Sequence, residues 1–151
     1  MEFSNSGLAL VKKLEGFRAR AYPDSGGKMT IGYGHLIVPG DGVPPGDIID
    51  PVKGTELLIR DVQQAVDCVN SCVKVDLDQT QFDALVIFTF NVGCSAFKHS
   101  TLLTMINAKN MVGATPQFLR WDMAGGNHIP GLHNRRVAEQ TLFTTGVYTE
   151  A

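Results

Sequence analysis

LEGFRARAYPDSGGKMTIGYGH, residues 14–35, is the most informative part of the chain for its fold. Gly16 is placed to end a preceding helix, because glycine readily adopts the positive φ values common after a helix C-terminus. Strand-like runs at 17–22 and 29–33 flank the Asp-Ser-Gly-Gly sequence at 24–27, which is typical of a hairpin turn. The order predicts a helix followed by a small antiparallel sheet. Such a sheet is marginally stable alone, so it must pack against helices.

The helix before this stretch is predicted to begin near Ser4 or Ser6, both of which are good N-cap residues. Its apolar side chains recur at helical spacing, at Leu8, Val11 and Leu14. After the hairpin, a third short strand is predicted over 36–38.

From residue 50 onward the pattern is helical. Asp50 and Pro51 are typical of an N-cap and a first helical residue, and they predict one long helix over 51–72. Asp78 or Thr80 is expected to begin the next helix, which Gly93 ends. Further helices are expected at 102–107, 111–121 and 135–144, with a loop over 124–133.

These elements predict an α+β fold in a single domain spanning residues 1–151. An N-terminal helix and a small antiparallel sheet would form one lobe, over about residues 1–50. The long helix would join that lobe to a mainly helical C-terminal lobe, over 51–151. The length of 151 residues suits one domain with its own core, without a metal or disulfide to hold it together.

Charge and hydropathy exclude some classes of protein. The formal net charge of −2 argues against a general nucleic-acid binder, which is usually strongly basic. The formal net charge is +2 over residues 1–35, −6 over 36–97 and +2 over 98–151. An anionic partner would therefore bind the two end segments; the alternative is that this gradient is ordinary solvated surface. No apolar run reaches the ~18 residues that a membrane span needs, and the N-terminus does not resemble a signal peptide. We expect no stable membrane association.

The cysteines and histidines do not form a recognisable metal motif. The chain has an odd number of cysteines, Cys68, Cys72 and Cys94, and no recognisable signal peptide. We therefore expect reduced, cytosolic thiols. Cys68 and Cys72 would share one helix face. Because there is no Cys-x2-Cys or His-x3-His spacing, the sequence predicts no metal and no cofactor.

Two carboxylates could carry chemistry. Glu15 lies at the end of the first helix, where the helix dipole disfavours its charged form, and Asp24 lies in the open turn. A protonated and an ionised carboxyl group on two sides of a sugar are what a glycosidase needs. Their spacing alone favours the plainer alternative, two surface carboxylates that have no shared role.

Short motifs at these positions resemble the phage-type lysozymes, the endolysins of glycoside hydrolase family 24. They are Leu14-Glu15-Gly16-Phe17, Ala21-Tyr22-x-Asp24 and Thr30-Ile31-Gly32-Tyr33-Gly34-His35. The family pattern Glu-x8-Asp-x5-Thr is kept by Glu15, Asp24 and Thr30. The resemblance continues in residues 88–93 and in a C-terminal signature from Trp121 to Leu142, so it covers nearly the whole chain.

The resemblance implies a lysozyme-type glycoside hydrolase that cuts the β-1,4 bond between N-acetylmuramic acid and N-acetylglucosamine in peptidoglycan. By position, Glu15 would be the general acid, and Asp24 and Thr30 would position water. We expect inversion, which places the two carboxyl groups ~6.5–9.5 Å apart; direct attack by Asp24, with ~5–5.5 Å, stays open.

The resemblance also implies contacts in a substrate cleft, at Gly34, Leu36, Phe90, Asn91 and Ser100. For Phe90 the alternative is plain core packing, because it lies on the apolar stripe of its helix.

His35 would form a structural pair with Asp61 that raises the pKa of the imidazole; a catalytic or metal-binding role is the alternative. Arg135 and Arg136 could bind carboxylates of the substrate, but ion pairing along their helix, as between Arg135 and Glu139, is the preferred interpretation. The Pro- and Gly-rich stretch 39–46 could modify access to the cleft or act as a spacer.

As an endolysin, the protein would act as a monomer on peptidoglycan glycan strands. It would stay in the host cytoplasm until a separate holin gives it access to the periplasm and the cell wall. Two other functions remain possible: a non-catalytic peptidoglycan-binding protein, and an exported antibacterial muramidase.

Overall fold

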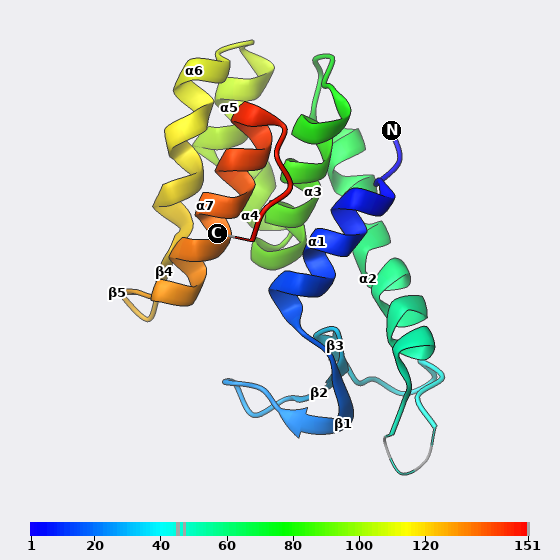
Figure 1. Cartoon of the computed structure of the whole chain (residues 1–151). Coiled ribbons are helices and arrows are strands. Elements are labelled where there is room, and N and C mark those ends of the chain that lie inside the picture. The colour runs from blue at the N-terminus through cyan, green and yellow to red at the C-terminus, as the bar shows by residue number, and fades with distance from the viewer. Residues whose placement is uncertain (45, 47, 151) are drawn as a thin grey trace.

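The computed structural model describes residues 1–44, 46 and 48–150; residues 45 and 47, in and beside the predicted loop 39–46, lie outside the described residues. Figure 1 shows a small sheet lobe below a larger group of helices, with α1 and the long helix α2 leading from one to the other. In chain order the elements are α1 (Asn5–Glu15), β1 (Arg18–Pro23), β2 (Met29–Gly32), β3 (His35–Leu36), α2 (Pro51–Cys72), α3 (Gln79–Val92), α4 (Cys94–Lys98), α5 (Thr101–Asn107), α6 (Met111–Ala114), the 3₁₀ helix η1 (Thr115–Trp121), β4 (Met123–Ala124), β5 (Asn127–His128) and α7 (Pro130–Thr145). The predicted α+β fold is confirmed.

The three-stranded sheet is antiparallel, in the order β1-β2-β3. Its first turn is the predicted hairpin, in which the Asp24 amide donates to the Lys28 carbonyl (2.8 Å) and the Gly27 amide donates to the Asp24 carbonyl (2.9 Å). In the register, Tyr22 is opposite Thr30 and Ile31 is opposite His35. The hairpin therefore sets the positions of Asp24 and Thr30 together.

Local capping explains where the main helices begin and end. The Ser4 hydroxyl accepts from the Gly7 amide (3.0 Å) to start α1, and Gly16, with φ +71°, ends it. Asp50 caps α2, whose bounds are the predicted ones. Asp78, rather than Thr80, caps α3. These boundaries follow from the sequence because each cap is made by neighbouring residues.

The C-terminal third differs from the predicted pattern. The expected helix over 111–121 is α6 followed by 3₁₀ helix, because Pro116 lacks the N–H that a continuous α-helix would need. The predicted loop 124–133 contains a hairpin, β4–β5, whose turn is Gly125-Gly126 with φ values of +59° and +83°. Helix α7 begins earlier than predicted, at Pro130, which is well suited to a first helical turn. Helix α4 was not predicted.

Two hydrophobic cores lie on either side of the region between the lobes. The small one joins Ile31 of β2 to Leu57 of α2, and the large one includes Leu10 and Val11 of α1. Helix α1 thus packs with the helical lobe although it precedes the sheet. Within the large core, Phe88 makes edge-to-face contacts with the rings of Phe97, Phe118 and Trp121.

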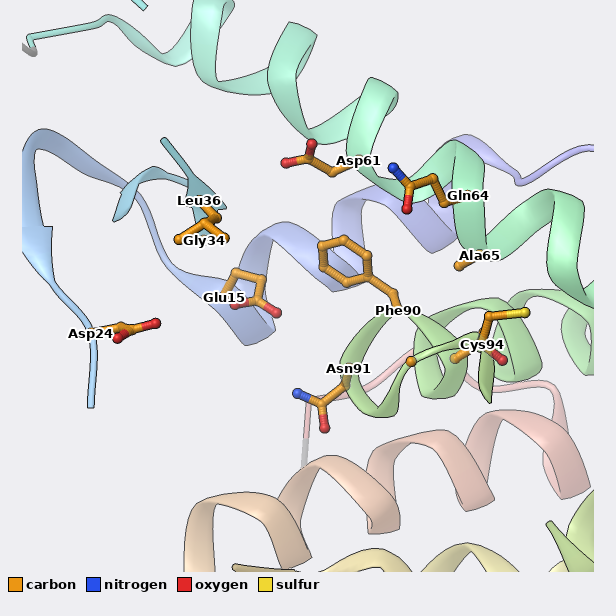
Figure 2. A pocket seen from close by; sticks show the side chains of 12 residues that line it. Glu15, Asp24, Gly34, Leu36, Asp61, Gln64, Ala65, Phe90, Asn91 and Cys94 are labelled. Atoms are coloured by element: carbon orange, nitrogen blue, oxygen red, sulfur yellow. The ribbon is translucent and has the colours of Figure 1, made fainter. Parts of the chain in front are cut away.

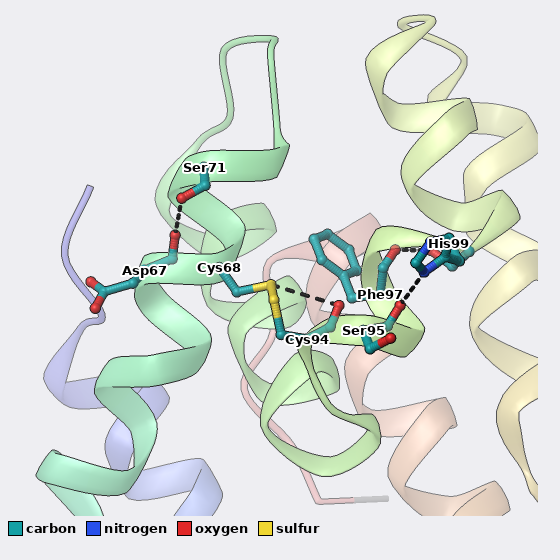
Figure 3. Close-up of a disulfide and its surroundings, with 8 residues drawn as sticks. Asp67, Cys68, Ser71, Cys94, Ser95, Phe97 and His99 are labelled. Carbon is teal, nitrogen blue, oxygen red and sulfur yellow. Dashed lines mark hydrogen bonds between the residues drawn. A yellow bond between two sulfur atoms is a disulfide. The ribbon is translucent and has the colours of Figure 1, made fainter.

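A disulfide joins Cys68 of α2 to Cys94 of α4, with their Cα atoms 5.9 Å apart (Figure 3). The prediction of reduced thiols is therefore wrong for these two residues; Cys72 is the free cysteine. The packing of α2 against α4 brings the two residues within disulfide distance, although they are 26 positions apart in sequence.

Candidate active site

A cleft of about 620 Å³ lies between the lobes (Figure 2). Six of the residues predicted to be catalytic or to contact substrate line it: Glu15, Asp24, Gly34, Leu36, Phe90 and Asn91. Its other lining residues were not predicted to be part of a cleft, namely Asp61, Gln64, Ala65, Thr89, Gly93 and Cys94. The fold thus brings together side chains from the end of α1, the sheet, α2 and the end of α3.

Glu15 is held by an arginine from the far end of the chain. Its Oε1 atom is 2.9 Å from Nη2 of Arg135 on α7, and the two side chains are only 16% and 17% exposed. Arg135 also donates to the carbonyl of Leu14 (3.3 Å). The predicted pairing of Arg135 with Glu139 is wrong, because α1 packs near α7 and offers a carboxylate there. Arg135 fixes the direction of the Glu15 carboxyl group.

Gly34 leaves room for the same carboxyl group. A Cβ atom at this position would lie 2.8 Å from Oε2 of Glu15, and the backbone φ of +78° is one that glycine adopts readily. The wall of the cleft therefore approaches Glu15 closely because residue 34 has no side chain.

Asp24 and Thr30 are both tied to Lys28. Oδ1 of Asp24 accepts from the amides of Gly26 (2.9 Å) and Lys28 (2.8 Å), and Figure 2 shows the carboxylate pointing toward the side of the cleft where Glu15 lies. The Thr30 hydroxyl donates to the Lys28 carbonyl (3.0 Å). Thr30 is 5% exposed and is not among the residues that line the cleft.

The end of α3 forms another wall. Phe90 lines the cleft and also packs against the large core, so core packing does not keep it out of the cleft. Thr89, which also lines the cleft, is 2% exposed, and its hydroxyl has no hydrogen-bond partner within the described part of the chain.

Asn91 is held from behind by Arg136. Nη2 of Arg136 donates to Oδ1 of Asn91 (2.9 Å) and to Oε2 of Glu139 (2.8 Å). Arg136 and Glu139 are both completely buried. Burial raises the pKa of the Glu139 carboxyl to about 7, although the charge of Arg136 acts in the opposite direction.

Ser100 lies away from the cleft. Its hydroxyl donates to the Phe97 carbonyl (2.7 Å) and accepts from the Leu103 amide (3.1 Å), which makes it the N-cap of α5. The side chain is 3% exposed and borders a different depression, together with Trp121.

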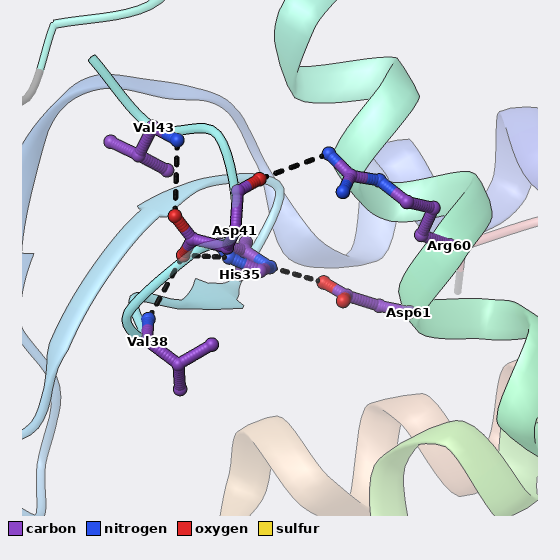
Figure 4. Close-up of polar contacts among 6 residues, drawn as sticks. All are labelled: His35, Val38, Asp41, Val43, Arg60 and Asp61. Carbon is purple, nitrogen blue, oxygen red and sulfur yellow. Dashed lines mark hydrogen bonds and ion pairs between the residues drawn. The ribbon is translucent and has the colours of Figure 1, made fainter.

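His35 lies between two carboxylates (Figure 4). Nδ1 is 2.7 Å from Oδ2 of Asp61, the predicted partner, and Nε2 is 2.8 Å from Oδ2 of Asp41, which was not predicted. Burial lowers the pKa of the imidazole, but the hydrogen bonds and charges of Asp41 and Asp61 outweigh it, so the pKa is raised. For Asp41, burial is likewise outweighed by hydrogen bonds from His35 and from the Val38 and Val43 amides, and its pKa falls to about 2.

Asp41 thereby anchors part of the stretch 39–46. Arg60 of α2 also donates to the carbonyl of Asp41 (3.1 Å). None of the described residues of this stretch lines the cleft. Among residues 1–44, 46 and 48–150, no His, Cys, Asp or Glu side chains are grouped so as to hold a metal ion. Helices long and apolar enough to cross a membrane are likewise absent from those residues.

A sheet lobe and a helical lobe, joined by a long helix and separated by a cleft with carboxylates on both sides, define a protein with the lysozyme-like fold. The chain belongs to the phage lysozyme family, whose family model matches residues 12–139. It is 43% identical to the endolysin of Salmonella phage P22 over 95% of this chain and 98% of that protein. Its structure is similar to that of the endolysin from Escherichia coli O157:H7 phage FAHEc1, with a TM-score of 0.90 at 37% identity, covering 99% of this chain and 97% of that one.

The endolysin of Bacillus phage B103 is 46% identical over 97% of this chain, but the match covers 55% of that protein. The chain thus spans about half the length of this relative. Proteins named SAR-endolysin also match, among them that of Bacteriophage PS119, which is 37% identical over 88% of this chain and 78% of that protein.

Proposed function

We propose that the chain is an endolysin muramidase that hydrolyses the β-1,4 bond between N-acetylmuramic acid and N-acetylglucosamine during lysis of a host bacterium. The observation that carries the proposal is the position of Glu15 and Asp24 on opposite sides of one cleft. Membership of the phage lysozyme family supports the same reaction.

In the proposed reaction, Glu15 donates its proton to the glycosidic oxygen as the bond from that oxygen to the anomeric carbon breaks. A water molecule attacks the anomeric carbon from the other side and gives its proton to Asp24. Because the Thr30 hydroxyl donates to the Lys28 carbonyl, its oxygen remains able to accept from that water. Asp24 and Thr30 would then hold both water protons and leave a lone pair free to attack.

The test measures new reducing ends from purified peptidoglycan with wild type, Glu15→Gln and Asp24→Asn. We expect both variants to lose most of the activity. Glu56→Gln is the matched control, because Glu56 is 64% exposed on α2 and is not among the cleft residues. Equal activity of Glu15→Gln and wild type would refute the role of Glu15. Binding without hydrolysis by wild type would instead favour a non-catalytic peptidoglycan-binding protein.

We propose that the mechanism inverts the anomeric configuration. NMR of the first product formed distinguishes the outcomes, since attack by water gives the α anomer from a β bond. A first product with the β configuration would instead indicate direct attack by Asp24.

We also propose that the protein acts as a monomer and reaches the wall through a membrane lesion made by a holin. Expression of the chain alone in a Gram-negative host should leave the culture turbid until the membrane is permeabilised with chloroform. Lysis on expression alone would contradict holin dependence and favour export, including the use of the chain as an exported antibacterial muramidase. Light scattering of the purified protein measures its oligomeric state.

A further inference from the structure

A buried ion pair that the proposed reaction does not use lies directly behind the cleft. Arg136 and Glu139 of α7 are each 0% exposed, and Arg136 donates to Asn91, which lines the cleft. Desolvating two charged groups is costly, and a buried pair of this kind is weak evidence for stability. Its contact with a residue of the cleft wall suggests a role in the site.

The arginine decides which way the Asn91 amide points. A guanidinium group has five N–H donors and no acceptor, so the amide can face it only with its oxygen. Oδ1 of Asn91 lies 2.9 Å from Nη2 of Arg136, in agreement with this. Figure 2 shows the nitrogen of Asn91 pointing the other way, into the cleft. The cleft therefore meets two N–H donors at this position.

Arg136 itself has little freedom. Its Nε and Nη2 atoms lie 2.8 Å from the two carboxylate oxygens of Glu139, and Nη1 donates to the Trp121 carbonyl (3.3 Å). The guanidinium also lies over the ring of Phe88, 5.0 Å from its centre. With the guanidinium fixed on these sides, the Asn91 amide is not free to turn over and present its oxygen to a ligand.

We propose that Arg136 is a positioning residue that makes Asn91 a donor-only contact for the carbonyl oxygen of an N-acetyl group on the glycan. This inference rests on the proposed function, which supplies a glycan with an N-acetyl group on every sugar. A sugar hydroxyl can donate or accept a hydrogen bond, so either the oxygen or the nitrogen of an amide would bind it. The acetamido carbonyl oxygen can only accept a hydrogen bond, so an amide selects it only when its nitrogen is held facing the cleft.

The first test measures binding by calorimetry, with all variants in a Glu15→Gln background. Two ligands are compared, N-acetylglucosamine oligomers and the same oligomers without acetyl groups. Asn91→Asp keeps an oxygen for Arg136 but turns a donor into an acceptor on the cleft side. We expect it to lower the preference for acetylated oligomers roughly five- to ten-fold, and Asn91→Ala to lower it by less, as one lost hydrogen bond implies. Asn134→Asp, an exposed change on α7 outside the cleft, is the matched control and should keep the preference.

The second test asks whether Arg136 acts through Asn91. Arg136→Lys keeps the charge but loses the planar fork, so we expect a higher KM with little change in kcat. The same substitution made in an Asn91→Ala background should leave KM unchanged, because the residue it positions is gone. If Arg136→Lys fails to fold, as judged by circular dichroism, Asn91→Asp decides the question.

An unchanged preference in both Asn91 variants, or an Arg136→Lys effect that persists in the Asn91→Ala background, would overturn the inference. These outcomes are separate from those of the proposed function. Absence of hydrolysis by wild type refutes the muramidase but leaves the binding experiment readable, because that experiment is done without turnover.

Discussion

Arg135 on α7 and Glu15 at the end of α1 form an ion pair of 2.9 Å at the cleft, joining two helices from opposite ends of the chain. The pair uses Oε1 of Glu15, while Oε2 lies against the backbone of Gly34. The carboxyl group proposed as the general acid is therefore held from two sides. Both contacts can be tested without changing Glu15 itself.

Replacing Arg135 should lower activity more than stability. Arg135→Met removes the group that orients the Glu15 carboxyl, and we expect kcat to fall roughly 10- to 100-fold, as misplacement of a catalytic group does. Arg135→Lys keeps the positive charge but lacks the planar guanidinium group, so its kcat should lie between those of wild type and Arg135→Met. Peptidoglycan hydrolysis and thermal unfolding are measured on both, with Arg120→Met on an exposed arginine as control. A wild-type kcat for Arg135→Met would count against this role.

Gly34→Ala should separate backbone strain from steric conflict at the site. At Gly34 a Cβ would meet Oε2 of Glu15 at 2.8 Å, whereas at Gly40, with nearly the same φ of +79°, it would meet nothing within 4 Å. Both substitutions should cost about 1–2 kcal/mol of unfolding free energy, because L-residues are strained at such φ values. Only Gly34→Ala should also lose most of the hydrolytic activity. Equal activity of the two variants would show that the close approach has no catalytic consequence.

The His35 cluster predicts a defined pH dependence of stability. The folded pKa of His35 is raised, so its contribution is complete below the unfolded value of ~6.5 and is lost as the pH rises through the folded value. The pKa of Asp41 is lowered to about 2, so its contribution is complete above the unfolded value of 3.8 and is lost as the pH falls toward 2.

The cluster should therefore stabilise the protein most between about pH 4 and 6.5. Urea unfolding across pH 3–9 measures this, and NMR measures the titration of His35. Asp41→Asn should reduce both the stability gain and the upward shift of the His35 pKa. An unaltered His35 titration in Asp41→Asn would mean that Asp61 alone sets it.

The Cys68–Cys94 disulfide should contribute roughly 3 kcal/mol to the stability of the oxidised protein, because the two cysteines are 26 positions apart in sequence. Cys94→Ser should therefore lower the unfolding midpoint, and reducing agent should lower that of wild type but not of the variant. Cys72→Ser, which leaves the disulfide intact, is the control. Thiol titration of the oxidised, denatured wild type should give one free thiol; three would contradict the disulfide.

Much of the local structure could be predicted because its causes are local. The Asp50 cap and Pro51 set the start of α2, and Gly16 and Gly93 end α1 and α3. The prediction of a loop over 124–133 failed because the two-residue turn at Gly125-Gly126 pairs two strands of only two residues each. Strands that short leave almost no alternating pattern in a sequence.

The candidate site was predicted in part, by resemblance rather than by spacing. Glu15 and Asp24 lie in one cleft, whereas Ser100, inferred in the same way, is occupied as the cap of α5. Asp41 was not found, because its contact with His35 depends on the path of the chain after β3. Thr89 was not predicted to line the cleft, because periodicity alone does not distinguish a core residue from one that lines a cleft.

The caps, turns and helical faces can be derived from the sequence, because they depend on residues within a few positions of one another. The tertiary structure alone decided which charged and thiol groups meet. Arg135 forms an ion pair with Glu15 instead of Glu139, Arg136 donates a hydrogen bond to Asn91, and Cys68 forms a disulfide with Cys94. Each of these contacts joins separate elements, and its geometry depends on how the helices pack around the large core, which no local pattern specifies.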